Sequence, residues 1–193
     1  MDQAAGYLVF SILGYLSGSV LYAWLLPKIF CKIDIRELSD DHNPGAFNAF
    51  HFAGKKVGVC VILLELLKAM IPVYVAGCFL DRNNLLFALV IAAPVIGHAF
   101  PIFHLKDGGK AIAASFGSLL GLIPDMRPVL FLCGFYLLFS LIVVIKSHLK
   151  RSIVTYVCFL IAGLFSFKKR AYILGSMIIS VVVVSKHLMA RRL

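Results

Sequence analysis

Seven apolar runs separated by short polar turns constrain this chain more than any other feature of its sequence. Crossing the hydrocarbon of a bilayer as a helix takes about 20 mainly apolar residues. The runs cover residues 6–30, 57–80, 85–103, 111–123, 129–145, 153–167 and 172–188. The fourth and sixth are short enough to be re-entrant or partly buried against neighbours. We predict an all-α integral membrane protein with about seven transmembrane helices in one bundle.

The composition agrees with a bilayer environment. Hydrophobic residues make up 61% of the 193 residues and charged residues 15%, whereas soluble domains are about 45–50% apolar and about 25% charged. This length suits a single membrane domain, residues 1–193, without a separate soluble domain. Residues 1–6 carry an acid and no basic segment, so we expect the first run to be retained as an anchor rather than cleaved.

The net charge of +10 does not indicate a nucleic-acid partner, because the basic residues lie at the ends of apolar runs, where anionic lipid headgroups attract them. The five cysteines are scattered and include no Cys-x-x-Cys pair. We therefore expect buried apolar cysteines rather than a metal site or a disulfide framework.

Basic residues also predict the orientation. With the N-terminus outside, thirteen lysines and arginines fall on the inner side and five on the outer side. The outer five are Arg82, Arg127, Lys168, Lys169 and Arg170, and the last three form a cluster that runs against the rule. This orientation puts the long loop, residues 31–54, and the turns 104–110 and 146–151 on the inner side.

The turn Gly108-Gly109-Lys110 joins two apolar runs and is the strongest local signal of function. Glycines permit close approach to backbone N–H groups, and together with an ammonium group they suit a phosphate. An ordinary inter-helix turn with an interfacial lysine is the alternative. A phosphate held at a bilayer surface favours lipid chemistry over solute transport.

The long loop offers further polar groups. Asn43 and Gly45 belong to an Asn-Pro-Gly turn, and Asn48 follows three residues later. The Asn side chains and the freed backbone N–H groups suit a small polar substrate, although such a turn also forms without function. Arg36 lies upstream, and its guanidinium suits a forked contact with phosphate.

Several polar residues fall within or at the ends of the apolar runs. Ser19 either lines the site or follows Gly18 in a close helix contact. Lys68 lies three residues after Glu65, so the two form an internal ion pair or Lys68 faces a phosphate. His98 and His187 approach the same polar side and suit acid–base or phosphate-binding roles, although a histidine at a helix end is commonly structural.

In their order and spacing these motifs resemble the bacterial acyl-phosphate:glycerol-3-phosphate acyltransferases, the PlsY family. That family shows Gly-Ser in the first span, DIR…GSGNPGATN, LLDLLKG, G-H-x-F-P-x-F and K-G-G-K-G-V-A-T. Over residues 14–118 this sequence reads GYLSGSV, DIRELSDDHNPGAFNAF, LLELLKA and GHAFPIFHLKDGGKAIAA. The later part of the chain is similar mainly in hydropathy and in His187.

The resemblance implies an enzyme of the bacterial inner membrane with its active site on the cytoplasmic face. Its substrates would be acyl phosphate and glycerol 3-phosphate, and its products lysophosphatidic acid and phosphate in phospholipid synthesis. No metal or other cofactor would be needed. Acyl-chain length, the exact acceptor (glycerol 3-phosphate or a similar one), oligomeric state and the general base (His98, His187 or a substrate phosphate oxygen) stay open.

The chain departs from the family motifs at particular positions. Asp40, Asp41 and His42 stand where the family has Gly-Ser-Gly, Ala111 replaces a glycine, and Ala190 replaces the asparagine of H-x-x-N. Two acids beside an anionic substrate oppose its binding unless they pair with Arg36 or a lysine. A catalytically impaired scaffold or lipid-binding protein is therefore an alternative, and a small transporter, which the Glu65–Lys68 pair could serve, is a less favoured one.

The predicted topology can be tested by labelling Gly45→Cys in intact cells with a membrane-impermeant thiol reagent. We expect labelling only after the membrane is permeabilised, because the loop at residues 31–54 is assigned to the inside. Ready labelling from outside would reverse the orientation.

Overall fold

The protein is described here by a computed structural model covering residues 3–39, 41–104 and 108–189. Over these residues it contains helices and no strand, which confirms the predicted all-α class. The helices are α1 (Gln3–Gly18), α2 (Tyr22–Phe30), α3 (Ile35–Leu38), α4 (Ala46–Phe52), α5 (Gly54–Phe79), α6 (Phe87–Ala99), α7 (Ile112–Leu120), α8 (Arg127–Leu137), the π-helical η1 (Leu138–Ile142), α9 (His148–Ser166) and α10 (Arg170–Met189).

Every predicted apolar run contains helix, but the lengths differ. Four segments within the described residues are long and apolar enough to cross a membrane, namely Gln3–Phe30, Gly54–Phe79, His148–Ser166 and Arg170–Met189. The helices Phe87–Ala99 and Arg127–Ile142 are shorter, and α7 has only 9 residues. The exact number of seven spans therefore remains a prediction.

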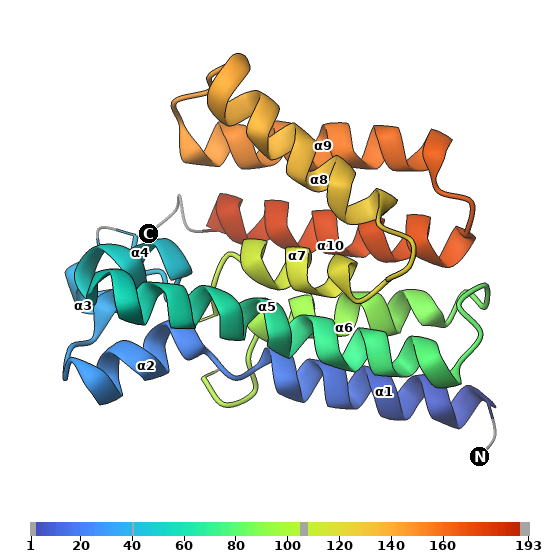
Figure 1. Cartoon of the computed structure of the whole chain (residues 1–193), viewed down its shortest axis with the longest axis horizontal. Helices are drawn as coiled ribbons and strands as arrows, with labels where there is room; N and C mark the ends of the chain where they lie inside the picture. Colours follow the sequence, from blue (N-terminus) through green and yellow to red (C-terminus); the bar gives the residue numbers. More distant parts are fainter. Residues whose placement is uncertain (1–2, 40, 105–107, 190–193) are drawn as a thin grey trace.

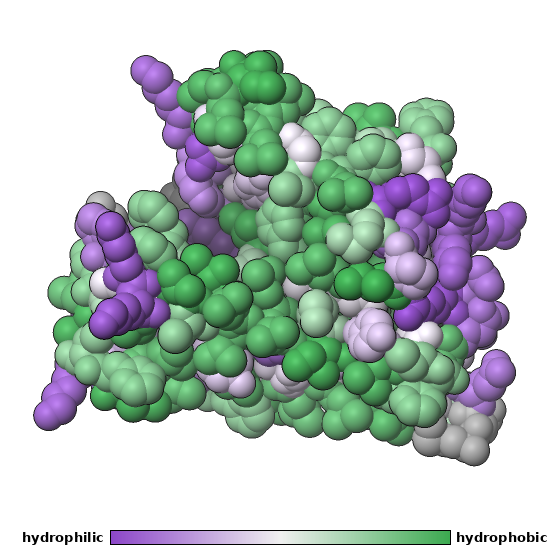
Figure 2. Space-filling view, in the orientation of Figure 1, coloured by the Kyte–Doolittle hydropathy of each residue, from purple (hydrophilic) through white to green (hydrophobic). Residues whose placement is uncertain are grey.

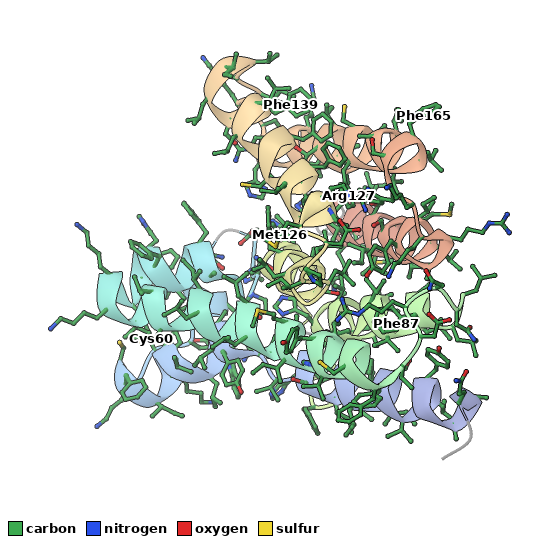
Figure 3. The ribbon with its side chains drawn as sticks, turned by 45° about the vertical axis from the view of Figure 1, so that its right-hand side comes forward. Cys60, Phe87, Met126, Arg127, Phe139 and Phe165 are labelled. Carbon is green, nitrogen blue, oxygen red and sulfur yellow. The ribbon has the colours of Figure 1, made fainter. Side chains whose placement is uncertain are left out.

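The helices pack side by side around α6 (Figure 1). Helix α1 covers one side of α6 and α10 another, while α5 packs against α7. Helices α8 and α9 pack on each other and form the outer part of the molecule with η1, where Figure 3 shows Phe139 and Phe165. Helix α6 is buried along nearly its whole length, because it is apolar on all sides.

Polar segments gather at the two ends of the helices. Figure 2 shows an apolar belt around the middle of the visible face and hydrophilic side chains at both ends. Large apolar side chains are exposed along the belt, as expected where lipid is the solvent, and Phe165 is 87% exposed. The α3–α4 region and the α8–α9 turn both lie toward the same end (Figure 1).

Two glycines bring α1 and α6 into direct backbone contact. A Cβ atom at Gly18 would lie 2.1 Å from the Pro94 carbonyl oxygen, and one at Gly97 would lie 2.1 Å from the Tyr15 carbonyl oxygen. The small-residue packing expected at Gly18 is therefore present.

A side chain at this contact should separate the two helices. We expect Gly97→Val to destabilise the protein by about 1–3 kcal/mol or more, because overpacking forces the backbones apart. The matched control is Gly134→Ala in α8, where an added Cβ meets nothing within 4 Å. Thermal unfolding in detergent would measure both, and equal midpoints for the two variants would contradict the close packing.

Candidate active site

The first span is interrupted between α1 and α2, and two buried side chains of α5 satisfy the interruption. Lys68 Nζ donates to the carbonyl oxygen of Val20 at 2.5 Å. Glu65 Oε1 accepts from the N–H of Ala23 at 3.2 Å. Lys68 Nζ also lies 2.7 Å from Glu65 Oε2. The internal ion pair is thus formed, and it compensates backbone groups that a broken helix would leave unpaired in a membrane.

His98, at the end of α6, joins this buried pair. Its Nδ1 lies 2.9 Å from Glu65 Oε2 and 3.0 Å from Lys68 Nζ. Lys68 Nζ is within hydrogen-bonding geometry of this nitrogen and, with three N–H donors, can serve it as well as Val20, while Glu65 Oε2 lies at ion-pair distance from the ring. The other ring nitrogen, Nε2, faces Gly109, where a Cβ would lie only 2.2 Å away.

The glycine-rich turn depends on its glycines for steric reasons. A Cβ at Gly108 would lie on the Ala99 carbonyl, and one at Gly109 would meet His98. The Gly109 N–H donates to the His98 carbonyl oxygen at 3.1 Å. The sequence suggested that this N–H group would bind a phosphate. In the structure it is already hydrogen-bonded within the chain. Ala111 follows with φ 59°, a left-handed conformation that favours glycine.

Arg36 is held in a clamp rather than in the cavity described below. Its Nε and Nη2 donate to the two carboxylate oxygens of Asp34 at 2.9 and 2.5 Å. Trp24 donates its indole N–H to the same carboxylate at 3.0 Å and lies under the guanidinium. Hydrogen bonding from Arg36 holds the pKa of Asp34 well below its usual range. The paired N–H groups of the Arg36 guanidinium are therefore bound to Asp34 in the structure. A phosphate contact by Arg36 stays a prediction.

Asp41 and Lys110 form an ion pair at the polar end of the site, 2.6 Å between Oδ2 and Nζ. Asp41 Oδ1 also accepts from Asn48 Nδ2 at 3.0 Å and from the Asn43 N–H at 3.3 Å. Partial burial raises the pKa of Asp41, but the hydrogen bonds from Lys110 and Asn48 outweigh it, so the pKa is lowered overall. Asp41, one of the two acids that the sequence places beside the expected anionic substrate, thus has a lysine partner.

A cavity of about 870 Å³ lies between the long loop, α4, α5 and α7. Its polar lining contains five of the predicted site residues, namely Asn43, Gly45, Asn48, His98 and Lys110. Asp41, Glu65, His51 and His148 add further polar groups. Its apolar lining includes Phe47, Phe52, Ile62, Leu66, Ile112, Phe116 and Leu120.

The other predicted residues lie around this cavity without lining it. Lys68 lies behind Glu65 and His98. Ser19 is buried, with Oγ donating to the Tyr15 carbonyl and accepting from the Ile102 N–H. Gly109 lies against His98, and Gly108 lies against the Ala99 carbonyl group.

His187 is buried behind His148, a residue of the inner turn 146–151 that no sequence motif singled out. The two rings are nearly parallel with centroids 5.7 Å apart. Only His148 lines the cavity. His187 Nδ1 bonds the Val183 carbonyl, and its Nε2 has no hydrogen-bond partner among the described residues. Asp40 and Ala190 lie outside the described residues.

The arrangement suits acyl chemistry at a membrane surface, since one cavity is lined by apolar side chains and also by a lysine and a histidine. Among the described residues no group of three His, Cys, Asp or Glu side chains could hold a metal ion. A family model described as glycerol-3-phosphate acyltransferase matches residues 8–192. The chain belongs to the glycerol-3-phosphate acyltransferase family. Membership makes it an acyltransferase of phospholipid synthesis.

Individual relatives are similar in sequence to this chain along most of their length. The glycerol-3-phosphate acyltransferase of Aliivibrio fischeri (strain MJ11) is 32% identical over 181 residues, covering 93% of this chain and 87% of that protein. The one from Thermotoga petrophila is 33% identical over 180 residues, covering 93% and 87%. The one from Bacillus cereus (strain G9842) is 35% identical over 182 residues, covering 94% and 87%.

Solved structures show the same fold. The crystal structure of PlsY (YgiH), an integral membrane glycerol 3-phosphate acyltransferase, in its glycerol 3-phosphate form has a TM-score of 0.83 and 24% identity, covering 96% of this chain and 90% of that one. The lysophosphatidic acid form has a TM-score of 0.81 and 23% identity, with the same coverage.

Double-mutant analysis can separate the structural role of Lys68 from a phosphate-binding one. Lys68→Met and Glu65→Gln should each lower the free energy of unfolding by about 3–5 kcal/mol, because each breaks a buried pair. The double variant should cost less than the sum, because no lone charge remains buried. Denaturant unfolding in detergent would measure this, and strictly additive losses would contradict the coupling.

Proposed function

We propose that this protein transfers a fatty acyl group from acyl phosphate to the 1-hydroxyl of glycerol 3-phosphate. The products are lysophosphatidic acid and phosphate. The site works at the cytoplasmic face of a bacterial inner membrane, with the N-terminus outside and residues 1–193 forming one membrane domain. Membrane lipids surround it, and it needs no nucleic acid and no cofactor.

One observation supports this proposal most strongly: the same cavity is lined by a set of apolar side chains and by polar groups that include a lysine and a histidine. Ile62 and Leu66 of α5 face the cavity together with Phe116 and Leu120 of α7, and these side chains suit an acyl tail. Lys110, Asn43 and Asn48, which also line it, suit phosphate and hydroxyl groups.

The chemistry demands little of the protein, because acyl phosphate is already activated. The acceptor hydroxyl oxygen attacks the acyl carbon, the bond from that carbon to the phosphate oxygen breaks, and phosphate leaves with its electron pair. Holding both substrates side by side and stabilising charge with Lys110 in a site shielded from water then supply most of the rate.

His98 is the best-placed general base. Its Nδ1 lies 2.9 Å from Glu65 Oε2, and His98 is among the residues that line the cavity. A carboxylate that orients an imidazole and stabilises its charged form is a recurring way of making a base. In this account His98 takes the hydroxyl proton, while His187 lies behind His148 and supports that wall.

The alternative of a catalytically impaired scaffold is favoured by one contact, the Asp41–Lys110 ion pair, which occupies the lysine. Incubation of the purified protein with palmitoyl phosphate and labelled glycerol 3-phosphate decides between the two. Formation of labelled lysophosphatidic acid supports the enzyme, and its absence at high enzyme concentration supports the scaffold.

Lys110→Ala should lower kcat/KM about 10- to 150-fold, the equivalent of a charge-assisted hydrogen bond of about 1.5–3 kcal/mol. Gly109→Val should impair turnover comparably, because its side chain would collide with His98. Lys56→Ala, at an exposed lysine of α5, is the matched control and should keep wild-type activity. The same radiolabel assay measures all three, and wild-type rates for the folded Lys110 variant would refute its phosphate role.

A further inference from the structure

The carboxylate of Asp41 sits among donors that suit a phosphate. It receives hydrogen bonds from Lys110 Nζ at 2.6 Å, Asn48 Nδ2 at 3.0 Å and the Asn43 N–H at 3.3 Å. These donors come from the turn before α7, from α4 and from the long loop, so they converge from separate segments. Carboxylate and phosphate oxygens accept from the same donor types.

Asp41 differs from the other acid of the cavity in how it is held. Glu65 is buried, with a side chain 1% exposed, and is locked by Lys68 and His98. The Asp41 side chain is 38% exposed and belongs to a loop rather than a helix. It can therefore leave its partners at a smaller cost than Glu65 can.

We propose that Asp41 is a built-in anion that occupies the phosphate position of this site, so that a phosphate-bearing substrate has to displace its carboxylate before binding. This inference rests on the proposed function for the identity of the substrate. Asp41 is then a specificity residue that lowers the affinity of the site for phosphate groups. The apolar lining of the cavity and His98 are not affected by it.

The loop does not need an acid at position 41 in order to fold, so the Asp41 carboxylate is available for a role in substrate binding. The resemblance noted above places a small neutral serine at this point of the family motif, and the backbone of the loop is held by other contacts. His42 Nδ1 lies 2.7 Å from the Arg36 carbonyl oxygen, and Asn48 Nδ2 also donates to the Asn43 carbonyl at 2.9 Å. Removal of the Asp41 charge should therefore leave the loop folded.

Calorimetric titration of the purified full chain with inorganic phosphate, and separately with glycerol 3-phosphate, tests the proposal without an acyl donor. Asp41→Asn should lower both dissociation constants at least tenfold, which is about 1.4 kcal/mol. Asp41→Ser should do the same and provides a second variant if the first fails to fold. Glu37→Gln, which removes an exposed charge of α3, is the matched control and should change neither constant.

A further variant tests whether the gain acts through the lysine. In the background of Lys110→Met, Asp41→Asn should give no more than a twofold gain, because the cation that the carboxylate occupies is gone. Equal gains from Asp41→Asn and Glu37→Gln would overturn the proposal, since they would indicate a general charge effect. Unchanged or weaker phosphate binding by both Asp41 variants would overturn it as well.

The outcome can be separated from that of the proposed function. Tighter phosphate binding without lysophosphatidic acid formation by any variant would retain the inference and reject acyl transfer. Turnover by the wild type with unchanged dissociation constants would do the reverse. If both hold, Asp41→Asn should lower the KM for glycerol 3-phosphate at least tenfold and leave kcat within twofold.

Discussion

The interactions of one buried carboxylate, that of Glu65, hold the rest of the site together. An isolated charge inside a membrane protein is costly, so Glu65 requires the partners that surround it. It binds Lys68, the backbone of α2 and His98, and Lys68 in turn binds the open backbone after α1. One network therefore joins the broken first span, the middle of α5 and the end of α6. Because His98 backs Gly109, the same network also positions the turn that presents Lys110.

Much of this architecture is readable from the sequence, because membrane burial leaves few ways to place an apolar run. The runs predicted the helices within a few residues, and Glu65 and Lys68 were expected on one face of their helix. Family motifs add finer detail than periodicity can. His42 and Ala111 stand where the motif has glycine, and both have positive φ values of 45° and 59°. The backbone of both turns thus follows the motif although the residues have changed.

Other features depend on contacts between distant segments and could not be deduced. The sequence offered Arg36 to a phosphate, but Asp34 lies two residues away and the structure pairs them beside Trp24. Gly109 was expected to offer its N–H outward, yet it is bonded to His98. Asp41 was noted as awkward, and only the fold shows that it meets Lys110 across 69 positions of sequence. The observed helix boundaries also differ from the predicted ones, because α1 and α2 divide a run that hydropathy alone treats as continuous.

The central claim is that phosphate binds at the lysine end of the cavity, beside a histidine held by Glu65. An experimental structure of the protein with bound glycerol 3-phosphate tests it most directly. The account predicts phosphate oxygens within hydrogen-bond distance of Lys110 Nζ and Asn48 Nδ2, with the Asp41 carboxylate displaced and the Glu65–His98 contact intact. Glycerol 3-phosphate bound elsewhere, with the Asp41–Lys110 ion pair undisturbed, would contradict it.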